Sequence, residues 1–155
     1  MLIGGTPAAA APPSTSQVLQ FYAGTGTAGA AVPGPYASSP LNSPMGTAFD
    51  SQGNMFISTY GTNNCQVLKV TPGGTLSVFA GSGPCTNATP GPATASGLNK
   101  PTNLAVDSQD NVYVIEDVGN RLSKITPGGT LSIVAGTGSS SGAIVEGPAT
   151  QSPRP

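Results

Sequence analysis

An internal repeat limits the possible folds of this chain more than any other feature of its sequence. The run Thr-Pro-Gly-Gly-Thr-Leu-Ser begins at Thr71 and recurs at Thr126, 55 residues later. The run Asp-Ser-Gln begins at Asp50 and recurs at Asp107, 57 residues later. Self-similarity on this scale is typical of folds in which each repeat is one supersecondary unit. The two-residue difference predicts a longer loop, residues 59–65, in the first copy.

Each copy divides into four short apolar runs separated by turns. In the second copy the runs are residues 103–107, 111–116, 121–126 and 130–135. The Pro-Gly-Gly that follows Thr126 is the strongest turn signal, because proline fixes φ and glycine permits positive φ. The runs are too short for helices and rich in branched and aromatic residues, which predicts strands. Four successive apolar residues, 112–115, predict a strand that is covered on both faces.

Four antiparallel strands in a repeated unit predict the blade of a β-propeller. A β-sandwich also uses short strands, but it does not require one four-stranded unit to recur. The predicted fold class is all-β: an incomplete propeller of two four-stranded antiparallel blades plus one N-terminal outer strand at residues 17–23. The expected parts are a flexible segment 1–16, the outer strand and connector 17–44, blade 1 with its connector 45–100, blade 2 at 101–136, and a connector toward a next blade 137–155.

The repeated motif resembles the bacterial form of the NHL-repeat family of β-propellers. The resemblance rests on Ala-Val-Asp-Ser-x-x-Asn-Val-Tyr-Val and Lys-Ile-Thr-Pro-Gly-Gly-Thr-Leu-Ser within residues 101–136, and more loosely on residues 44–81. In the family motif, Glu116 stands at an Asp position, Asn120 at a His position and Arg121 at an Arg position. The resemblance implies a six-bladed wheel, of which this chain supplies about two blades as a fragment or as an assembling protomer.

The resemblance leaves two classes of function open. One is a non-catalytic scaffold or binding module for a protein or carbohydrate ligand. The other is part of a propeller hydrolase or lyase, similar to gluconolactonase, whose active site needs blades that are absent here. The chain contains no histidine, which excludes a Ser-His-Asp mechanism and a His-ligated zinc site within it. We therefore expect the module, with no catalytic residue, no metal and no cofactor.

The charge of the chain argues against a nucleic-acid partner, and its hydropathy argues against a membrane-spanning helix. Its formal net charge is −1 with only five basic residues, so it lacks the basic face that nucleic-acid binding requires. No apolar run approaches the length of a membrane helix.

Two blades would leave two apolar faces and one strand edge uncovered, which predicts contact with the missing blades or self-association.

Two loops on the predicted frame are candidates for binding, because loops on rigid scaffolds commonly carry recognition. The alternative interpretation is that both are ordinary solvated loops. For the loop that carries Glu116, Asp117 and Arg121, a salt bridge between blades is a further alternative. The candidate residues are Glu116, Asp117, Asn120 and Arg121 in the second copy, and Tyr60, Asn63 and Asn64 in the first.

Cys65 and Cys85 are the only two cysteines. Antiparallel pairing around the turn at residues 71–74 would place Cys65 opposite about Ala80, so a short hook of the connector would bring Cys85 back to it. We expect a disulfide rather than two free thiols. A disulfide implies an oxidising compartment, either extracellular or periplasmic.

Overall fold

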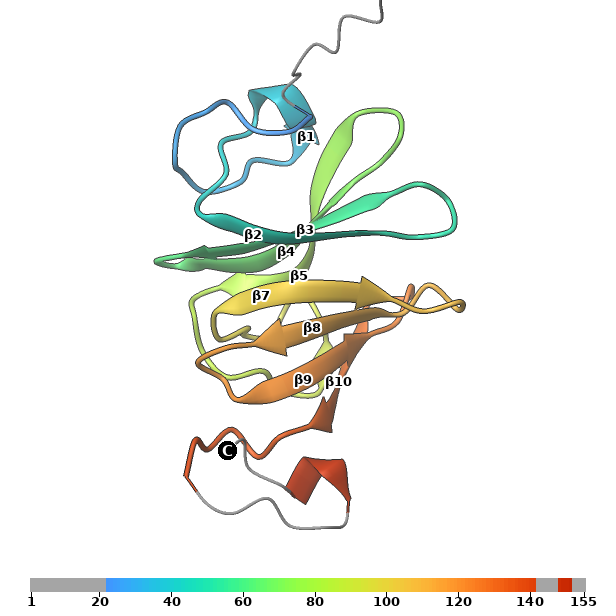
Figure 1. Cartoon of the computed structure of the whole chain (residues 1–155). Helices are drawn as coiled ribbons and strands as arrows, with labels where there is room; N and C mark the ends of the chain where they lie inside the picture. The colour runs from blue at the N-terminus through green and yellow to red at the C-terminus, as the bar shows by residue number, and fades with distance from the viewer. Residues whose placement is uncertain (1–21, 142–147, 152–155) are drawn as a thin grey trace, which may run out of the picture.

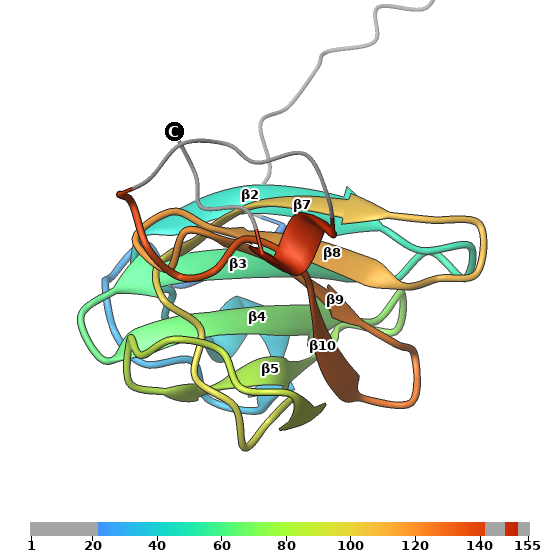
Figure 2. The same cartoon turned by 90° about the horizontal axis from the view of Figure 1, so that it is seen from below.

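The computed structural model describes residues 22–141 and 148–151 as two antiparallel β-sheets stacked face to face (Figures 1 and 2). The first sheet, blade 1, has the strand order β1-β5-β4-β3-β2, and the second, blade 2, has the order β6-β10-β9-β8-β7. Blade 1 contains β2 (Pro44–Phe49), β3 (Met55–Gly61), β4 (Asn64–Val70) and β5 (Thr75–Gly83). Blade 2 contains β7 (Pro101–Val106), β8 (Val112–Glu116), β9 (Arg121–Ile125) and β10 (Thr130–Ala135). The all-β fold is that of an incomplete β-propeller.

Each blade has a fifth strand of two residues that the sequence did not predict. These are β1 (Gly34–Pro35), which pairs with β5, and β6 (Gly91–Pro92), which pairs with β10. Both come from the connector that precedes the blade. The Gly-Pro pairs that mark the connectors therefore extend the outer edge of each sheet.

The predicted N-terminal outer strand at 17–23 lies mostly outside the described residues. Only Tyr22 and Ala23 are described, and neither belongs to a strand. Within residues 22–141 and 148–151, the remaining regular structure is two short 3-10 helices, η1 (Tyr36–Ser38) and η2 (Ala149–Gln151). No helix in the described part of the chain is long and apolar enough to cross a membrane.

The connectors dock onto the blades by one repeated hydrogen bond. In each of three places along the chain, a glycine N–H donates to the carbonyl of the residue that follows the next Gly-Pro pair. The three bonds are Gly24 to Tyr36 at 3.2 Å, Gly81 to Ala93 at 2.9 Å and Gly136 to Ala149 at 2.9 Å. The contact thus recurs three times with one geometry, although only two blades are present.

The connectors also build the hydrophobic core. Ala88, Ala93 and Leu98 of the central connector are buried between the two blades, against Phe56 of blade 1 and Val114 of blade 2. Ala31, Tyr36 and Leu41 of the first connector pack on the opposite face of blade 1. In Figure 1 these N-terminal residues lie on one side of the stack and the C-terminal residues lie on the other.

The prediction that 112–115 would be covered on both faces is wrong for blade 2. Val112 and Val114 are fully buried toward blade 1, but Ile115 is 40% exposed. Its counterpart in blade 1, Ser58, is 0% exposed because blade 2 lies over it. In blade 1 the first connector covers the face that points away from blade 2, so Met55 and Ile57 of β3 are buried there as well. The face of β8 that carries Ile115 has no such cover in the described part of the chain.

The prediction of a longer loop at 59–65 is also wrong. The two extra residues lengthen strands β3 and β4, which pair as far as Gly61 and Asn64. The turn between them is only Thr62 and Asn63. In blade 2 the pairing ends at Glu116 and Arg121, so residues 117–120 form the longer turn.

Candidate functional site

The predicted binding residues come from the two hairpins β3–β4 and β8–β9, which occupy equivalent places in the two blades. Asn63 and Asn120 are the last turn residues before β4 and β9, and both have left-handed backbone angles, with φ of 55° and 50°. Asparagine tolerates this conformation better than most residues, so its presence in both turns has a local structural cause. We call the surface formed by residues 60–64 and 116–121 the hairpin end.

Glu116 lies beneath the hairpin end and is 0% exposed. Its carboxylate accepts a hydrogen bond of 2.8 Å from the backbone N–H of Asn99 and one of 2.5 Å from the hydroxyl of Ser123. Burial raises the pKa of Glu116, and the hydrogen bonds from Ser123 and Asn99 offset part of that effect. Glu116 therefore fastens the connector to blade 2 and does not reach a ligand at this surface.

Arg121 also acts within the protein frame. Its Nη1 donates to the carbonyl of Ala88 at 2.8 Å, and its Nη2 donates to the carbonyl of Thr137 at 3.2 Å. One guanidinium thus joins the connector before blade 2 to the connector after it. Its Nε is buried without a hydrogen-bond partner.

Asp117 and Asn120 remain at the surface of the second hairpin. Asp117 is exposed, and its backbone N–H donates to the carbonyl of Lys100 at 3.0 Å. The side chain of Asn120 donates to the carbonyl of Val118 at 3.0 Å. The four predicted residues of this loop therefore divide into an outer pair, Asp117 and Asn120, and an inner pair, Glu116 and Arg121.

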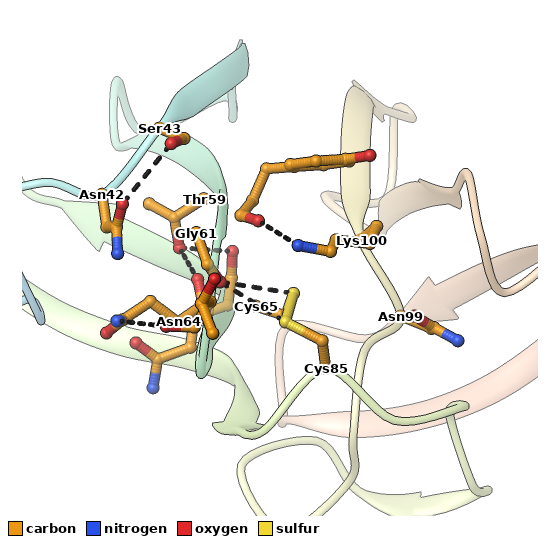
Figure 3. Close-up of a disulfide and its surroundings, with 12 residues drawn as sticks. Asn42, Ser43, Thr59, Gly61, Asn64, Cys65, Cys85, Asn99 and Lys100 are labelled. Atoms are coloured by element: carbon orange, nitrogen blue, oxygen red, sulfur yellow. Dashed lines mark hydrogen bonds between the residues drawn. A yellow bond between two sulfur atoms is a disulfide. The ribbon is translucent and has the colours of Figure 1, made fainter.

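Tyr60 of the first hairpin is held by a lysine that the sequence did not single out. The Nζ of Lys100 donates to the carbonyl of Tyr60 at 2.9 Å and lies 4.4 Å from the centre of its ring, a cation–π contact between the two blades (Figure 3). Lys100 has a left-handed φ of 59°, and its repeat counterpart Ser43 is also left-handed, with a φ of 51°. The only sequence signal for this position is that each residue precedes the proline that starts an inner strand.

Asn63 and Asn64 lie at the tip of the first hairpin. Asn63 is exposed, and the amide nitrogen of Asn64 donates to the carbonyl of Thr62 at 3.0 Å. Asn63 is thus the residue of this pair that offers its side chain to solvent.

The structure joins Cys65 and Cys85 in a disulfide beside the first hairpin (Figure 3). Cys65 lies opposite Gly83, not Ala80 as the sequence suggested, because two register shifts interrupt the β4–β5 pairing. The carbonyl of Gly61 lies 3.8 Å from the Cys65 sulfur and 3.4 Å from the Cys85 sulfur. Since neither bonded sulfur carries a hydrogen, these are packing contacts. The disulfide fixes the segment that follows β5 to β4, beside the turn of the first hairpin.

The hairpin end offers amides, backbone groups, one aromatic ring and the carboxylate of Asp117, which is exposed. In the described part of the chain, no three Cys, Asp or Glu residues gather as ligands for a metal ion. The buried carboxylate of Glu116 beneath this surface accepts a hydrogen bond on each of its two oxygens.

Comparison with known proteins supports the fold alone. No protein-family profile matches the chain, and no curated protein matches it significantly. A protein of unknown function from Bacteroides thetaiotaomicron is similar in structure, with a TM-score of 0.60 and 23% sequence identity over 72% of this chain. The chain spans only 28% of that protein.

Two further solved structures are less similar. Virginiamycin B lyase from Staphylococcus aureus has a TM-score of 0.44 and 18% identity, covering 59% of this chain and 26% of its own. An auxiliary nutrient binding protein from Bacteroides thetaiotaomicron has a TM-score of 0.49 and 16% identity, covering 58% and 25% respectively. With TM-scores below 0.5, these two carry no argument about this chain.

Proposed function

We propose that the chain is a segment of an NHL-type β-propeller that serves as a non-catalytic binding module. The proposal rests on contacts inside the protein: Glu116 and Arg121 form hydrogen bonds to the connectors, and the Cys65–Cys85 disulfide joins β4 to the segment after β5. They hold the two hairpins on a frame of paired strands. A pre-organised surface loses less conformational entropy when a ligand binds.

The ligand class follows from what the hairpin end presents. Asn63, Asp117 and Asn120 offer side chains at the surface, and Tyr60 adds a partly exposed ring. Amides both donate and accept, which matches the hydroxyl groups of a sugar. We assign the surface to a neutral, hydroxyl-rich ligand of the carbohydrate class.

An oxidising location is part of the proposal. Both cysteines are bonded, and disulfides persist chiefly in extracellular and periplasmic proteins. The low charged fraction of 7% is in keeping with a secreted surface. The measurement is thiol counting on protein purified from its native compartment: no free thiol before reduction and two after it.

Binding is tested by titrating isotope-labelled protein with neutral oligosaccharides of glucose, mannose and N-acetylglucosamine. The expected result is a shift of amide signals confined to residues 60–64 and 116–121. Asn63→Gly should weaken binding by about tenfold, because it removes one polar contact worth about 1.4 kcal/mol while glycine keeps the left-handed turn. The matched control is Ser132→Ala on an exposed position of β10, which should leave affinity unchanged.

The same samples separate the module from the hydrolase or lyase alternative. The oligosaccharides, together with a panel of sugar lactones, should be recovered unaltered by mass spectrometry. Product formation, or one equivalent of tightly bound calcium by metal analysis, would overturn the non-catalytic assignment. Binding at other residues alone would overturn the assignment of the hairpin end.

A further inference from the structure

Lys100 connects the two hairpins of the hairpin end. Its backbone carbonyl accepts the N–H of Asp117 at 3.0 Å, at the start of the second turn. Its side-chain Nζ donates to the carbonyl of Tyr60 in the first hairpin at 2.9 Å, across the junction between the blades (Figure 3). One residue therefore holds an aromatic residue and an acidic residue of this surface relative to each other.

The repeat separates the role of the Lys100 side chain from the role of its backbone. The counterpart Ser43 has the same left-handed backbone, and its carbonyl accepts the matching bond, from the N–H of Tyr60 at 3.0 Å. The Ser43 hydroxyl bonds the neighbouring Asn42 at 3.4 Å and stays within its own blade. The bend before the inner strand therefore does not require the link that the Lys100 side chain makes between the blades.

The backbone angle of Lys100 supports the same conclusion. A φ of 59° is unfavourable for a long side chain, and glycine or asparagine adopts it more easily. Unfavourable angles of this kind persist where the surrounding structure holds them, and they cluster at functional sites. Lysine at this position is explained by its hydrogen bond and its cation–π contact with Tyr60, and not by its backbone preference.

Tyr60 is the one aromatic residue among residues 60–64 and 116–121, and its backbone is bonded on both sides. Its N–H donates to Ser43 and its carbonyl accepts from Lys100. The side chain is half-buried, with the Lys100 Nζ 4.4 Å from the ring centre. Because the ammonium group lies over one face of the ring, a stacking ligand must use the opposite face.

A pyranose sugar needs two kinds of partner. Its hydroxyl groups lie around the rim of the ring, whereas its axial C–H bonds form an apolar patch on each face. The face of an aromatic ring is partly negative and attracts such C–H groups. A carboxylate accepts hydrogen bonds from neighbouring hydroxyl groups. Tyr60 and the exposed Asp117, the two residues that Lys100 connects, offer these two groups.

We propose that Tyr60 and Asp117 form a subsite for one pyranose ring, with Lys100 as its positioning residue. The apolar face of the sugar stacks on Tyr60, and its hydroxyl groups donate to Asp117. Lys100 fixes the Tyr60 ring and the Asp117 backbone before the ligand arrives, which lowers the entropy lost on binding. The subsite favours rings of the glucose type, whose equatorial hydroxyl groups leave both faces flat. This inference deepens the proposed carbohydrate-binding function and rests on it.

The test measures the affinity of Lys100 variants for cellotriose by the same titration. Lys100→Met removes the hydrogen bond and the cation and should weaken binding about tenfold. Lys100→Arg keeps a cation and a donor and should restore most of the affinity. The matched control is Lys124→Met, which removes a lysine 5.9 Å from the ring centre of Tyr113, outside the hairpin end, and should leave affinity unchanged. Wild type should bind cellotriose more tightly than mannotriose, whose axial hydroxyl groups protrude from one face of each ring.

Two further readouts separate a positioning role from a purely structural one. The ring current of Tyr60 should shift the C–H protons of bound cellotriose upfield, and Tyr60→Leu should abolish that shift. In the Tyr60→Leu background, Lys100→Met should cause little further loss of affinity, because the lysine side chain acts through the ring. Every variant is measured well below its melting point, so that a loss of stability does not count as a loss of affinity.

The outcomes distinguish this inference from the proposed function. Unchanged affinity in Lys100→Met, or losses that add in the double variant, would overturn the positioning role while binding at the hairpin end stands. Amide shifts confined to residues 60–64 and 116–121 without an upfield shift of the sugar C–H protons, or equal affinity for the two trisaccharides, would overturn the stacking subsite alone. Absence of binding by any of the sugars would overturn both proposals.

Discussion

Asp110 of blade 2 binds Ser51 of blade 1 with both carboxylate oxygens. Oδ1 accepts the backbone N–H of Ser51 at 2.8 Å and Oδ2 accepts its hydroxyl at 2.7 Å, although the two residues are 59 positions apart. The repeat counterpart of Asp110 in blade 1 is Gly53, which has no side chain to make such a link. The bond therefore joins blade 2 back to blade 1 at the turns opposite the hairpin end.

Asp110→Gly, which keeps the left-handed φ of 61° without strain, should reduce the free energy of unfolding by about 1 kcal/mol through the lost link to Ser51. Urea denaturation at neutral pH is the measurement. Gln109→Ala in the same turn is the control, since its side chain bonds only Ser108 and should change stability little. Equal losses in the two variants would show that the turn, and not the link between blades, is responsible.

Removing the disulfide with Cys65→Ala and Cys85→Ala should reduce stability by about 3 kcal/mol. The bond closes a loop with a sequence separation of 20, and loop closure restricts the unfolded chain. Calorimetry of the double variant and of the wild type with and without reductant measures the loss. The reduced wild type should match the double variant, and an unchanged melting point upon complete reduction would contradict the prediction.

Gly46→Ala should separate the blades. A methyl group at this position would lie 2.5 Å from the carbonyl oxygen of Thr102, so the inner strands must move apart. We expect a loss of about 2 kcal/mol or more, in the range of overpacked core sites. The matched control is Asn103→Ala, the repeat counterpart on the face of blade 2 that points away from blade 1, which should cost far less. Similar losses at the two positions would mean that the contact between blades does not depend on close approach here.

The buried Glu116 predicts a pH dependence with a definite sign. Its pKa is raised in the folded state, so between the unfolded pKa, near 4.5, and the higher folded pKa, the folded state binds more protons than the unfolded state. Its contribution to stability is thus full below that window and is lost as the pH rises through it. Glu116→Gln, which keeps an acceptor for Asn99, should remove this loss.

The measurement is the difference in unfolding free energy between wild type and Glu116→Gln across pH 4 to 8. The variant should gain relative stability as the pH rises and then reach a plateau. Comparing the two proteins cancels the opposite effect of Asp50 and Asp107. Hydrogen bonds hold both of those pKa values below the usual range, although burial opposes the shift. A difference that does not vary with pH would refute a raised pKa for Glu116.

The sequence by itself determined the local structure of each repeat. Pro-Gly-Gly and Asp-Ser-Gln fix their turns through local backbone preferences, and the short runs of branched residues between them form strands. The spacing of Cys65 and Cys85 across one hairpin also pointed to the bond between them. These features depend on neighbours close in the chain, so one repeat is sufficient to predict them.

Only the tertiary structure decided which sheet faces are covered and which polar side chains form hydrogen bonds inside the protein. Ile115 and Ser58 occupy matched positions, yet one is exposed and the other is buried, because only blade 1 has a following blade in this chain. Glu116 looked like a surface residue in the sequence, but the connector folds over it and uses its carboxylate. Burial depends on contacts between segments far apart in the chain, and the pattern within a single strand does not contain that information.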